Sequence, residues 1–205
     1  PHARSSISAH LPAARTAASS SVAEPIPSLN ALAWLRAHQR ACQLTALAHQ
    51  GGRSVGANKR VRHHVNPLRS NHQNPLELAD AWTRDYYQIP TNPLHVDIGC
   101  ARGVFCLDAA QALRDEWNVL GLEIREPHVD AARADVERLG LRNAAFFSTN
   151  ANVNLERILA AAAPVSPVRC VSIQFPDPWF KAKHHKRRVV QPPLVRTIAD
   201  WLEPG

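Results

Sequence analysis

An acid and a dense group of cations share one short stretch near the C-terminal end of this 205-residue sequence. Residues 172–192 read SIQFPDPWFKAKHHKRRVVQP, and Asp177 is the single acid among them. Pro176 and Pro178 flank Asp177 and restrict the backbone on both sides of its carboxylate. A restrained acid beside so much positive charge predicts a site that handles an anionic polymer.

The cations that follow Asp177 are candidates for binding phosphate groups. A solvated surface run is the ordinary alternative for such a charge cluster. We expect no metal site, because His184 and His185 have no cysteine or second histidine cluster at ligand spacing around them. The cations with an expected phosphate contact are Lys181, Lys183, Lys186, Arg187 and Arg188.

A second group of polar residues lies upstream, at the ends of predicted strands. Ligands of open parallel sheets bind beyond the carboxyl ends of the strands, where we expect Asp97, Glu123 and Asn150 to lie. Gly99 and Gly103 would let a ligand approach the backbone, and Glu123 could accept both hydrogens of a ribose diol. A simple strand-to-helix turn is the alternative, but the acid twenty residues after Gly103 favours an adenosine-containing cofactor.

The elements that must position these residues alternate after Pro90, as strands and helices do in a parallel α/β sheet. Apolar runs predict strands at 94–98, 119–122 and 144–147, and the alternation of Val171, Ile173 and Phe175 predicts a fourth strand that ends at Pro176. We expect helices after Gly103, from Pro127 to Gly140 and from Pro192 or Pro193 onward. The apolar positions expected to face the sheet are Val104, Leu107, Ala110, Leu113 and Trp117 in the first helix, Val129, Ala132, Val136 and Leu139 in the second, and Leu194, Ile198 and Leu202 in the last.

The turn at residues 99–103 favours one of two cofactors. NAD usually requires GxGxxG, but GCARG has no third glycine at that spacing. Asp97 lies just before the turn, where it would repel a pyrophosphate and could face a sulfonium cation. The sequence therefore favours S-adenosyl-L-methionine over NAD.

With these motifs in place, the chain resembles the tRNA (guanine-N7)-methyltransferase family. The similar segments are HVDIGCARGVF, LGLEIREP, STNANV and IQFPDPWFKAKHHKRRVVQP, with RVRHHVNPL upstream, and together they span about residues 60–205. The last block is much more specific than the glycine turn, which alone would indicate only some class I methyltransferase. The resemblance implies a Rossmann-like α/β domain with helices on both faces of the sheet.

The resemblance also implies an activity, which is methyl transfer from S-adenosyl-L-methionine to N7 of a guanosine at position 46, in the variable loop of tRNA. By position, Asp177 corresponds to the family's catalytic acid and Lys181 to a substrate contact. Guanine N7 attacks with its own lone pair, so we expect Asp177 to orient the base and not to remove a proton. The residues that correspond to cofactor contacts are Asp97, Gly99, Glu123, Ile124, Arg125, Asn150, Ala151 and Gln174.

Two aromatic residues follow Asp177. Trp179 and Phe180 could stack on a base. Aromatic residues beside a strand end more often pack in the core, so we expect core packing for both.

Three departures from the family pattern are evident. Ala101 stands where many members have glycine, and we expect it to be tolerated with a negative φ angle. The family continues into further strands and substrate residues that are absent after Gly205, so we expect an exposed sheet edge and a C-terminally truncated domain that is unstable or inactive alone. The long basic N-terminus has no counterpart in the family core.

Charge and composition divide the chain. Residues 1–76 carry nine Lys or Arg and one acid, whereas residues 77–205 are nearly balanced, so the net charge of +7 belongs to the N-terminal third. We predict a targeting or disordered segment at 1–52, a basic arm at 53–75 and the methyltransferase domain at 76–205. No apolar run approaches the length of a membrane span.

The first residues are rich in Ala, Ser and Arg, which is typical of an organellar transit peptide. Frequent serine favours the chloroplast over the mitochondrion, and a disordered basic tail on a cytoplasmic or nuclear protein is the alternative. The chain contains no methionine, which predicts a fragment or a processed form. Residues 29–48 are compatible with a weakly amphipathic helix.

Two other functions stay open on the residues alone. Another class I methyltransferase, acting on a different RNA or on a protein, would need the cofactor residues but not the PDPWFKAKHHKRR block. A non-catalytic tRNA-binding subunit would need the cations but not Asp97, Glu123 and Asp177, all of which are present.

Overall fold

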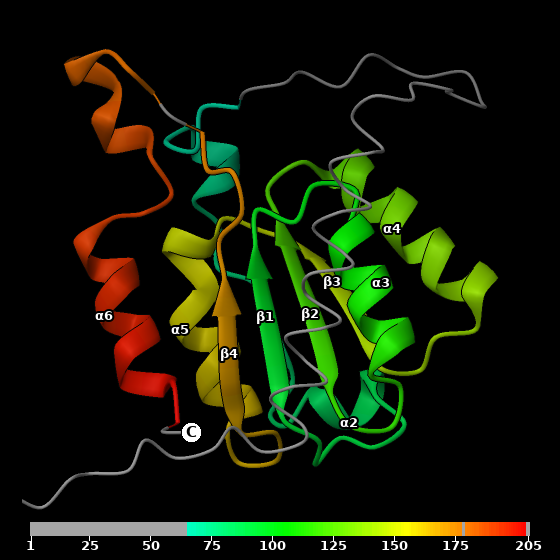
Figure 1. Cartoon of the computed structure of the whole chain (residues 1–205). Helices are drawn as coiled ribbons and strands as arrows, with labels where there is room; N and C mark the ends of the chain where they lie inside the picture. The colour runs from blue at the N-terminus through cyan, green and yellow to red at the C-terminus, as the bar shows by residue number, and fades with distance from the viewer. Residues whose placement is uncertain (1–64, 178, 204–205) are drawn as a thin grey trace, which may run out of the picture.

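Four parallel strands form the sheet of the computed structural model, which describes residues 65–177 and 179–203. The strands are β1 (Leu94–Ile98), β2 (Asn118–Glu123), β3 (Ala144–Ser148) and β4 (Val168–Ser172), in the spatial order β3-β2-β1-β4 (Figure 1). Among the described residues, β4 has a neighbouring strand on one side alone. The prediction of a Rossmann-like α/β sheet is confirmed.

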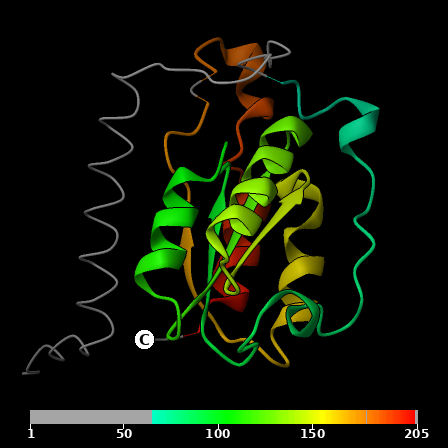
Figure 2. The same ribbon diagram turned by 90° about the vertical axis from the view of Figure 1, so that its right-hand side faces the viewer.

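Helices cover both faces of this sheet, as Figures 1 and 2 show. On one face α3 (Val104–Ala112) and α4 (Glu126–Leu139) enclose a core with Val119, Val129 and Phe146. On the other face α5 (Ala151–Ala162) and α6 (Pro192–Trp201) enclose a core with Trp82 and Phe147. All five residues of β1 are buried, and its two polar side chains, His95 and Asp97, are accordingly paired with Ser172 of β4.

The described residues also form three short helices. They are η1 (Ser70–His72), α2 (Thr83–Tyr86) and η2 (Ala182–Arg187). The segment that contains η1 runs beside the N-terminus of α5, and η2 follows β4 at the carboxyl edge of the sheet (Figure 1). The predicted targeting segment, the predicted helix at 29–48 and residues 53–64 of the basic arm lie outside the described residues.

The glycine turn is held against the sheet by a close contact. A Cβ atom at Gly121 in β2 would lie 2.4 Å from Phe146 Cδ1, and one at Gly103 would lie 2.4 Å from Phe146 Cε1. Gly103 also has a φ angle of 72°, which other residues rarely adopt. Glycine at both positions therefore lets the turn and β2 pack on one phenyl ring.

The inner face of α3 differs from the prediction at Val104 and at Trp117. Val104 is 41% exposed, whereas Phe105 and Cys106 are buried. The ring of Phe105 packs edge-on against His95 of β1, with the ring centroids 5.6 Å apart. Because residues 104–107 are all apolar, the helical period alone could not decide which of them face the sheet. Trp117 lies beyond the end of the helix.

Two predicted ends also differ in the structure. β4 ends at Ser172, and Phe175 is 86% exposed with a φ angle of 47°, so the predicted strand as far as Pro176 was too long. A positive φ angle turns the chain away from the extended path that a strand requires. Leu202 follows α6 and is 40% exposed, so it does not belong to the helix's inner face, whereas Leu194 is buried as predicted.

Candidate active site

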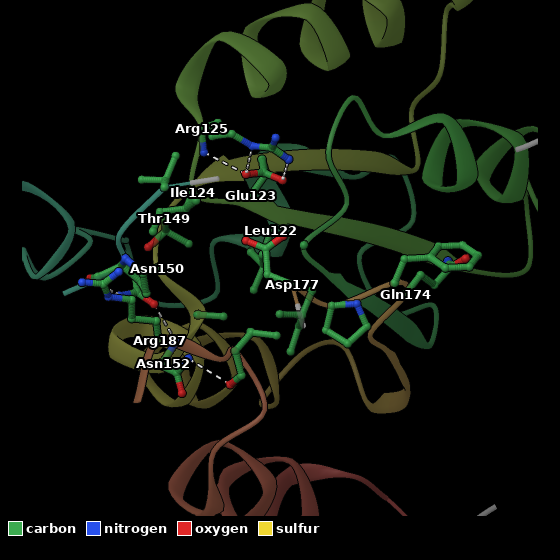
Figure 3. A pocket seen from close by; sticks show the side chains of 18 residues that line it. Leu122, Glu123, Ile124, Arg125, Thr149, Asn150, Asn152, Gln174, Asp177 and Arg187 are labelled. Atoms are coloured by element: carbon green, nitrogen blue, oxygen red, sulfur yellow. Dashed lines mark hydrogen bonds and ion pairs between the residues drawn. The ribbon is translucent and has the colours of Figure 1, made fainter. Parts of the chain in front are cut away.

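A pocket of about 150 Å³ lies beyond the carboxyl ends of the strands (Figure 3). A second pocket of about 470 Å³ adjoins it and shares Ile124, Arg125 and Asn150 with it. The first pocket is bounded by the ends of β1, β2 and β3 and by the loop after β4. Of the predicted site residues, it brings together Gly99, Glu123, Ile124, Arg125, Asn150, Ala151, Gln174, Asp177 and Arg187.

Glu123 ends β2, and both oxygens of its carboxylate accept hydrogen bonds. Its Oε1 accepts from the Arg125 backbone N–H at 3.0 Å and from Arg125 Nε at 2.9 Å. Its Oε2 accepts from Arg125 Nη2 at 3.1 Å and from the Ala101 backbone N–H at 3.0 Å. Figure 3 shows this pair as the dashed lines between the two side chains. A ribose diol would therefore have to displace the Arg125 guanidinium to reach the carboxylate.

The charge state of this pair follows from burial and pairing. Burial acts to raise the pKa of Glu123, but the hydrogen bonds and positive charge of Arg125, with the Ala101 N–H, outweigh it and lower the pKa below its ordinary value. Burial acts to lower the pKa of Arg125, but Glu123 and then Asp177 raise it. Glu123 is therefore ionised at neutral pH, although it is only 4% exposed.

The turn from Gly99 to Gly103 is hydrogen-bonded to the end of β2. The N–H groups of Gly99 and Cys100 donate to the Leu122 carbonyl at 2.8 and 3.1 Å. Gly99 has a φ angle of 82°, and a Cβ atom there would meet nothing within 4 Å, so the backbone is open to a ligand at this point. The expectation of a negative φ angle at Ala101 was wrong, because its φ angle is 50°. The bond from its N–H to Glu123 requires this turn conformation in spite of the methyl group.

Asp97 does not line the pocket. It is 2% exposed, and its Oδ1 accepts a 2.7 Å hydrogen bond from Ser172 Oγ in β4. The same hydroxyl lies 2.8 Å from His95 Nε2, and Cys106 Sγ lies 3.5 Å from Asp97 Oδ2. The carboxylate thus joins β1 to β4, and the predicted contact of Asp97 with a cofactor stays a prediction.

Asp177 lies on the far side of the pocket from β3, five residues after the end of β4. It is half-buried, and its negative charge acts on Arg125 across the pocket. Gln174 lines the same wall. Glu123 and Asp177 therefore line one cavity, and the negative charge of each raises the pKa of Arg125.

The cations after Asp177 divide into two groups. Arg187 lines the pocket, its guanidinium lies 5.1 Å from the centroid of the Trp179 ring, and its buried Nε has no hydrogen-bond partner among the described residues. Arg188 Nη2 lies 3.4 Å from the Trp179 carbonyl. Lys181, Lys183 and Lys186 are exposed. Arg187 thus lies at the pocket wall, Arg188 is half-buried beside Trp179, and the lysines are exposed.

The aromatic residues of this loop are not core residues. Phe180 is 86% exposed, so the expected core packing was wrong for this side chain. Trp179 is half-buried and packs edge-on against His184, with the ring centroids 5.6 Å apart. Partial removal of water and then the nearby cations, Arg187 first, lower the pKa of His184. This histidine is therefore neutral at physiological pH.

Two asparagines connect residues 65–76 to the rest of the domain. Asn150 was predicted as a cofactor contact, whereas Asn154 was not predicted as a site residue. Asn150 Oδ1 accepts from the Asn152 N–H at 3.1 Å and caps α5, while its Nδ2 lies 3.2 Å from the carbonyls of Pro67 and His72. Asn154 is 2% exposed and binds the Leu76 N–H at 2.8 Å and the Asn74 carbonyl at 3.0 Å. These bonds place residues 65–76 beside the pocket, and Val65 and Pro67 line it.

Two further pocket residues, Thr149 and Asn152, were not predicted as site residues, although both lie in the STNANV segment. Thr149 and Asn152 line the pocket because β3 and the N-terminus of α5 bring them there. Among the described residues, no group of three or more His, Cys, Asp and Glu side chains could hold a metal ion. No helix in the described part of the chain is long and apolar enough to cross a membrane.

The strand order, the glycine turn after β1 and the acid at the end of β2 define a class of protein, the Rossmann-like α/β proteins that bind an adenosine-containing ligand at the carboxyl edge of the sheet. Comparison with known proteins narrows this class. The family model Methyltransf_4, described as "Putative methyltransferase", matches residues 91–205.

Curated relatives carry a more specific name. The tRNA (guanine-N(7)-)-methyltransferase of Thermosynechococcus vestitus is 53% identical over 71% of this chain and 65% of its own length. That of Microcystis aeruginosa is 52% identical over 73% of this chain and 69% of its own length, and that of a Synechocystis species is 49% identical over 73% and 68%. The chain belongs to the tRNA (guanine-N7)-methyltransferase family. It spans about two thirds of the length of these relatives.

Solved structures match over smaller parts. A precorrin 8W decarboxylase from Methanobacterium thermoautotrophicum aligns with a TM-score of 0.38 and 18% identity over 59% of this chain and 54% of that chain. A protein-L-isoaspartate O-methyltransferase aligns with a TM-score of 0.34 and 16% identity over 44% and 26%. These scores are too low for an inference about this chain.

Proposed function

We propose that this protein transfers a methyl group from S-adenosyl-L-methionine to N7 of a guanosine in tRNA. The observation that carries this proposal is that Glu123 and Asp177 line one pocket whose rim continues into the cationic helix η2. The names of relatives about 50% identical to this chain support the choice of methyl acceptor.

The residues of the pocket fit an adenosine-containing methyl donor. The Glu123 carboxylate suits a ribose diol, and the open backbone at Gly99 leaves room for close approach. Ile124 and Ala151 offer apolar surface near the ends of β2 and β3, while Asn150, Gln174 and Arg125 offer polar groups on the same cavity. S-adenosyl-L-methionine supplies an activated methyl group on a sulfonium centre, so the protein's task is alignment.

Asp177 would align the methyl acceptor. Guanine N7 has a free lone pair and carries no proton, so a strong general base is unnecessary. The N1–H and 2-amino groups of guanine lie on the opposite edge of the base from N7. A carboxylate that accepts hydrogen bonds from them would hold N7 toward the centre of the pocket. Half-burial strengthens these hydrogen bonds relative to bulk water.

The cationic residues would hold the RNA backbone. Arg187 lies at the pocket wall and would contact the phosphate nearest the target nucleotide, or the anionic end of the cofactor. Arg188 is half-buried, whereas Lys181 and Lys186 are exposed, and all three would contact phosphates farther along the strand. Such contacts fix the register of the RNA and carry little sequence information.

Several finer points belong to the same proposal. The acceptor would be guanosine 46 in the variable loop, as the resemblance implies. The composition of residues 1–27 supports an organellar location, the chloroplast first, with cytoplasm or nucleus as the alternative. The basic arm would add electrostatic attraction for tRNA, because its segment 65–76 lies beside the pocket.

The test is a methylation assay on the full-length protein. Labelled S-adenosyl-L-methionine is incubated with bulk tRNA, and the product is cleaved chemically at N7-methylguanosine. We expect label in tRNA and cleavage at a single position in the variable loop. Label in protein or in another RNA, with none in tRNA, would refute the proposal.

A further inference from the structure

Two phenylalanines after β4 are exposed to the same degree but differ in position. Phe175 and Phe180 are each 86% exposed. Phe175 lines the pocket that contains Asp177, whereas Phe180 lies next to the lysines and does not line it. Exposure of a large apolar side chain has a hydration cost that an ordinary surface position does not need to bear. At the mouth of a ligand pocket, the same exposure leaves a ring face available for contact.

The backbone at Phe175 is also strained. Its φ angle of 47° lies in the left-handed region, which is unfavourable for residues with a Cβ atom, and aromatic residues are uncommon there. Trp179 has a φ angle of 38°, so two such residues bracket Asp177. Glycine would remove the strain at position 175. Strain of this kind concentrates at functional sites, where the side chain's placement compensates for it.

The neighbours of Phe175 match the parts of one nucleotide. Asp177 can accept hydrogen bonds from a base edge, and Arg187 can bind a phosphate. An exposed aromatic ring supplies what these two residues lack, which is a flat surface for the face of the base. A guanine nucleotide carries all three complementary features.

We propose that Phe175 is the stacking platform that positions the target guanine over the pocket, with Asp177 on the base edge. This assignment rests on the proposed methyl transfer to guanine N7. It gives Phe175 a positioning role that Phe180 does not share, even though the two rings are equally exposed. Trp179 is less suited to this role, because it does not line the pocket and its ring contacts His184 and Arg187.

The first experiment compares planar and non-planar side chains in the full-length protein. Phe175→Leu keeps apolar surface but loses the aromatic face, whereas Phe175→Tyr keeps it. We expect Phe175→Leu to lower single-turnover methylation of tRNA about 5- to 150-fold, the range for loss of one base–aromatic stack, and Phe175→Tyr to restore most of it. The Kd for S-adenosyl-L-methionine, measured by calorimetry, should be unchanged in both variants.

The second experiment separates stacking from folding. Phe175→Gly relieves the left-handed backbone, so its Tm should not fall, while its methylation rate falls as far as in Phe175→Leu. Phe180→Gly and Phe180→Leu are the matched controls. Both controls should leave methylation within about twofold of the parent, because loss of an exposed side chain away from the pocket has a small effect.

Three results would overturn the stacking role. Equal activity of Phe175→Leu and Phe175→Tyr would show that the site needs only apolar surface, as a packing contact with another part of the protein would. A lower Tm in Phe175→Gly would also indicate that the Phe175 ring packs against another part of the protein. Weaker cofactor binding in step with weaker methylation would assign the ring to the cofactor. If the parent protein methylates no tRNA, the proposed function is refuted. The stacking role is then tested by comparing the binding of guanosine monophosphate to the same variants.

Discussion

The two sides of the pocket are built in opposite ways. On the side of β1, β2 and β3, the polar groups are buried and paired, as Glu123 with Arg125 and Asn150 with the Asn152 N–H illustrate. On the side of the loop after β4, Phe175 is exposed and strained, Asp177 is half-buried, and the lysines face solvent. A small cofactor of constant shape suits a preformed wall. A large RNA suits a wall with projecting aromatic and cationic side chains.

The largest effect expected from this contrast concerns Asp177. Asp177→Asn keeps the shape of the side chain but replaces an acceptor by a donor amide, which would face the N–H groups of guanine. Because small misplacement of a reacting group has a large effect on rate, we expect kcat for tRNA methylation to fall about 100-fold or more. Steady-state kinetics with purified tRNA would measure the loss.

The cofactor side should not respond to this change. The Kd for S-adenosyl-L-methionine in Asp177→Asn should stay within about threefold of the parent value, because the substituted atoms belong to the other wall. Asp108→Asn, a half-buried carboxylate of α3 outside the pocket, is the matched control and should retain activity. Near-normal turnover in Asp177→Asn would refute its orienting role.

Glu123 is expected to give the complementary result. Glu123→Gln removes the charge that attracts a ribose diol and that binds Arg125. Hydrogen bonds to a charged group contribute about 1.5–3 kcal/mol, so the Kd for the cofactor should rise about 10- to 150-fold, with kcat at saturating cofactor changed little. Calorimetric titration would measure the Kd. Glu126→Gln, an exposed acid at the start of α4, should leave it unchanged.

Glu123 also makes a prediction about pH. Its folded-state pKa lies below the ordinary value of 4.5. Ionised Glu123 therefore contributes stability above pH 4.5, and this contribution is lost as the pH falls through the lower folded-state pKa. The Tm of the parent protein should drop more steeply than that of Glu123→Gln in this acid range. Parallel Tm curves would show that the pair does not stabilise the fold.

The cofactor wall could be predicted from the sequence to a greater extent than the substrate wall. Periodic apolar residues placed β1, β2 and β3 within one or two residues, and Gly140 marked the end of α4. These features depend on local patterns, which a short window of sequence contains. The acid at the end of β2 followed from the same patterns.

The substrate wall depends on long-range contacts. The end of β4 at Ser172 and the positive φ angles of Phe175 and Trp179 are imposed by tertiary structure against local preference. The division between Arg187 at the pocket and Lys186 in solvent follows from how η2 is placed on Trp179. Asn154 is hydrogen-bonded to residues about eighty positions earlier in the chain, and no short sequence motif predicts such a bond.

The exposed lysines offer a test of the electrostatic half of the contrast. Combined Lys181→Gln, Lys183→Gln and Lys186→Gln should weaken tRNA binding and reduce the slope of log K against log salt by about 2 to 3, the value expected for three lost phosphate contacts. Filter binding over a series of salt concentrations would measure both quantities.

The control removes the same charge from the opposite edge of the sheet. Arg84, Arg114 and Arg142 are exposed and lie near the amino ends of the strands. Changing all three to Gln alters net charge equally. A similar loss of slope in both triple variants would mean that overall charge, and not the surface of η2, attracts the RNA.

The smallest expected effect concerns Arg125, which donates hydrogen bonds to both oxygens of Glu123. Arg125→Met would leave a buried carboxylate with fewer donors. The empty protein should lose stability, because an unpaired buried charge is costly. A cofactor diol would then satisfy oxygens that no side chain occupies, so cofactor affinity should rise, about tenfold for a difference of about 1.4 kcal/mol.

The direction of the change in cofactor Kd distinguishes two roles for the Arg125 guanidinium. If Arg125 competes with the cofactor for Glu123, Arg125→Met lowers the Tm of the empty protein and tightens the Kd, and the cofactor raises the Tm more than in the parent. If Arg125 instead contacts the cofactor directly, the Kd weakens. Arg138→Gln breaks an exposed ion pair with Asp135 of the same 2.9 Å length and should change neither quantity. A tighter Kd would show that even the preformed wall rearranges when the cofactor binds, with Arg125 released toward Asp177, whose charge already acts on it.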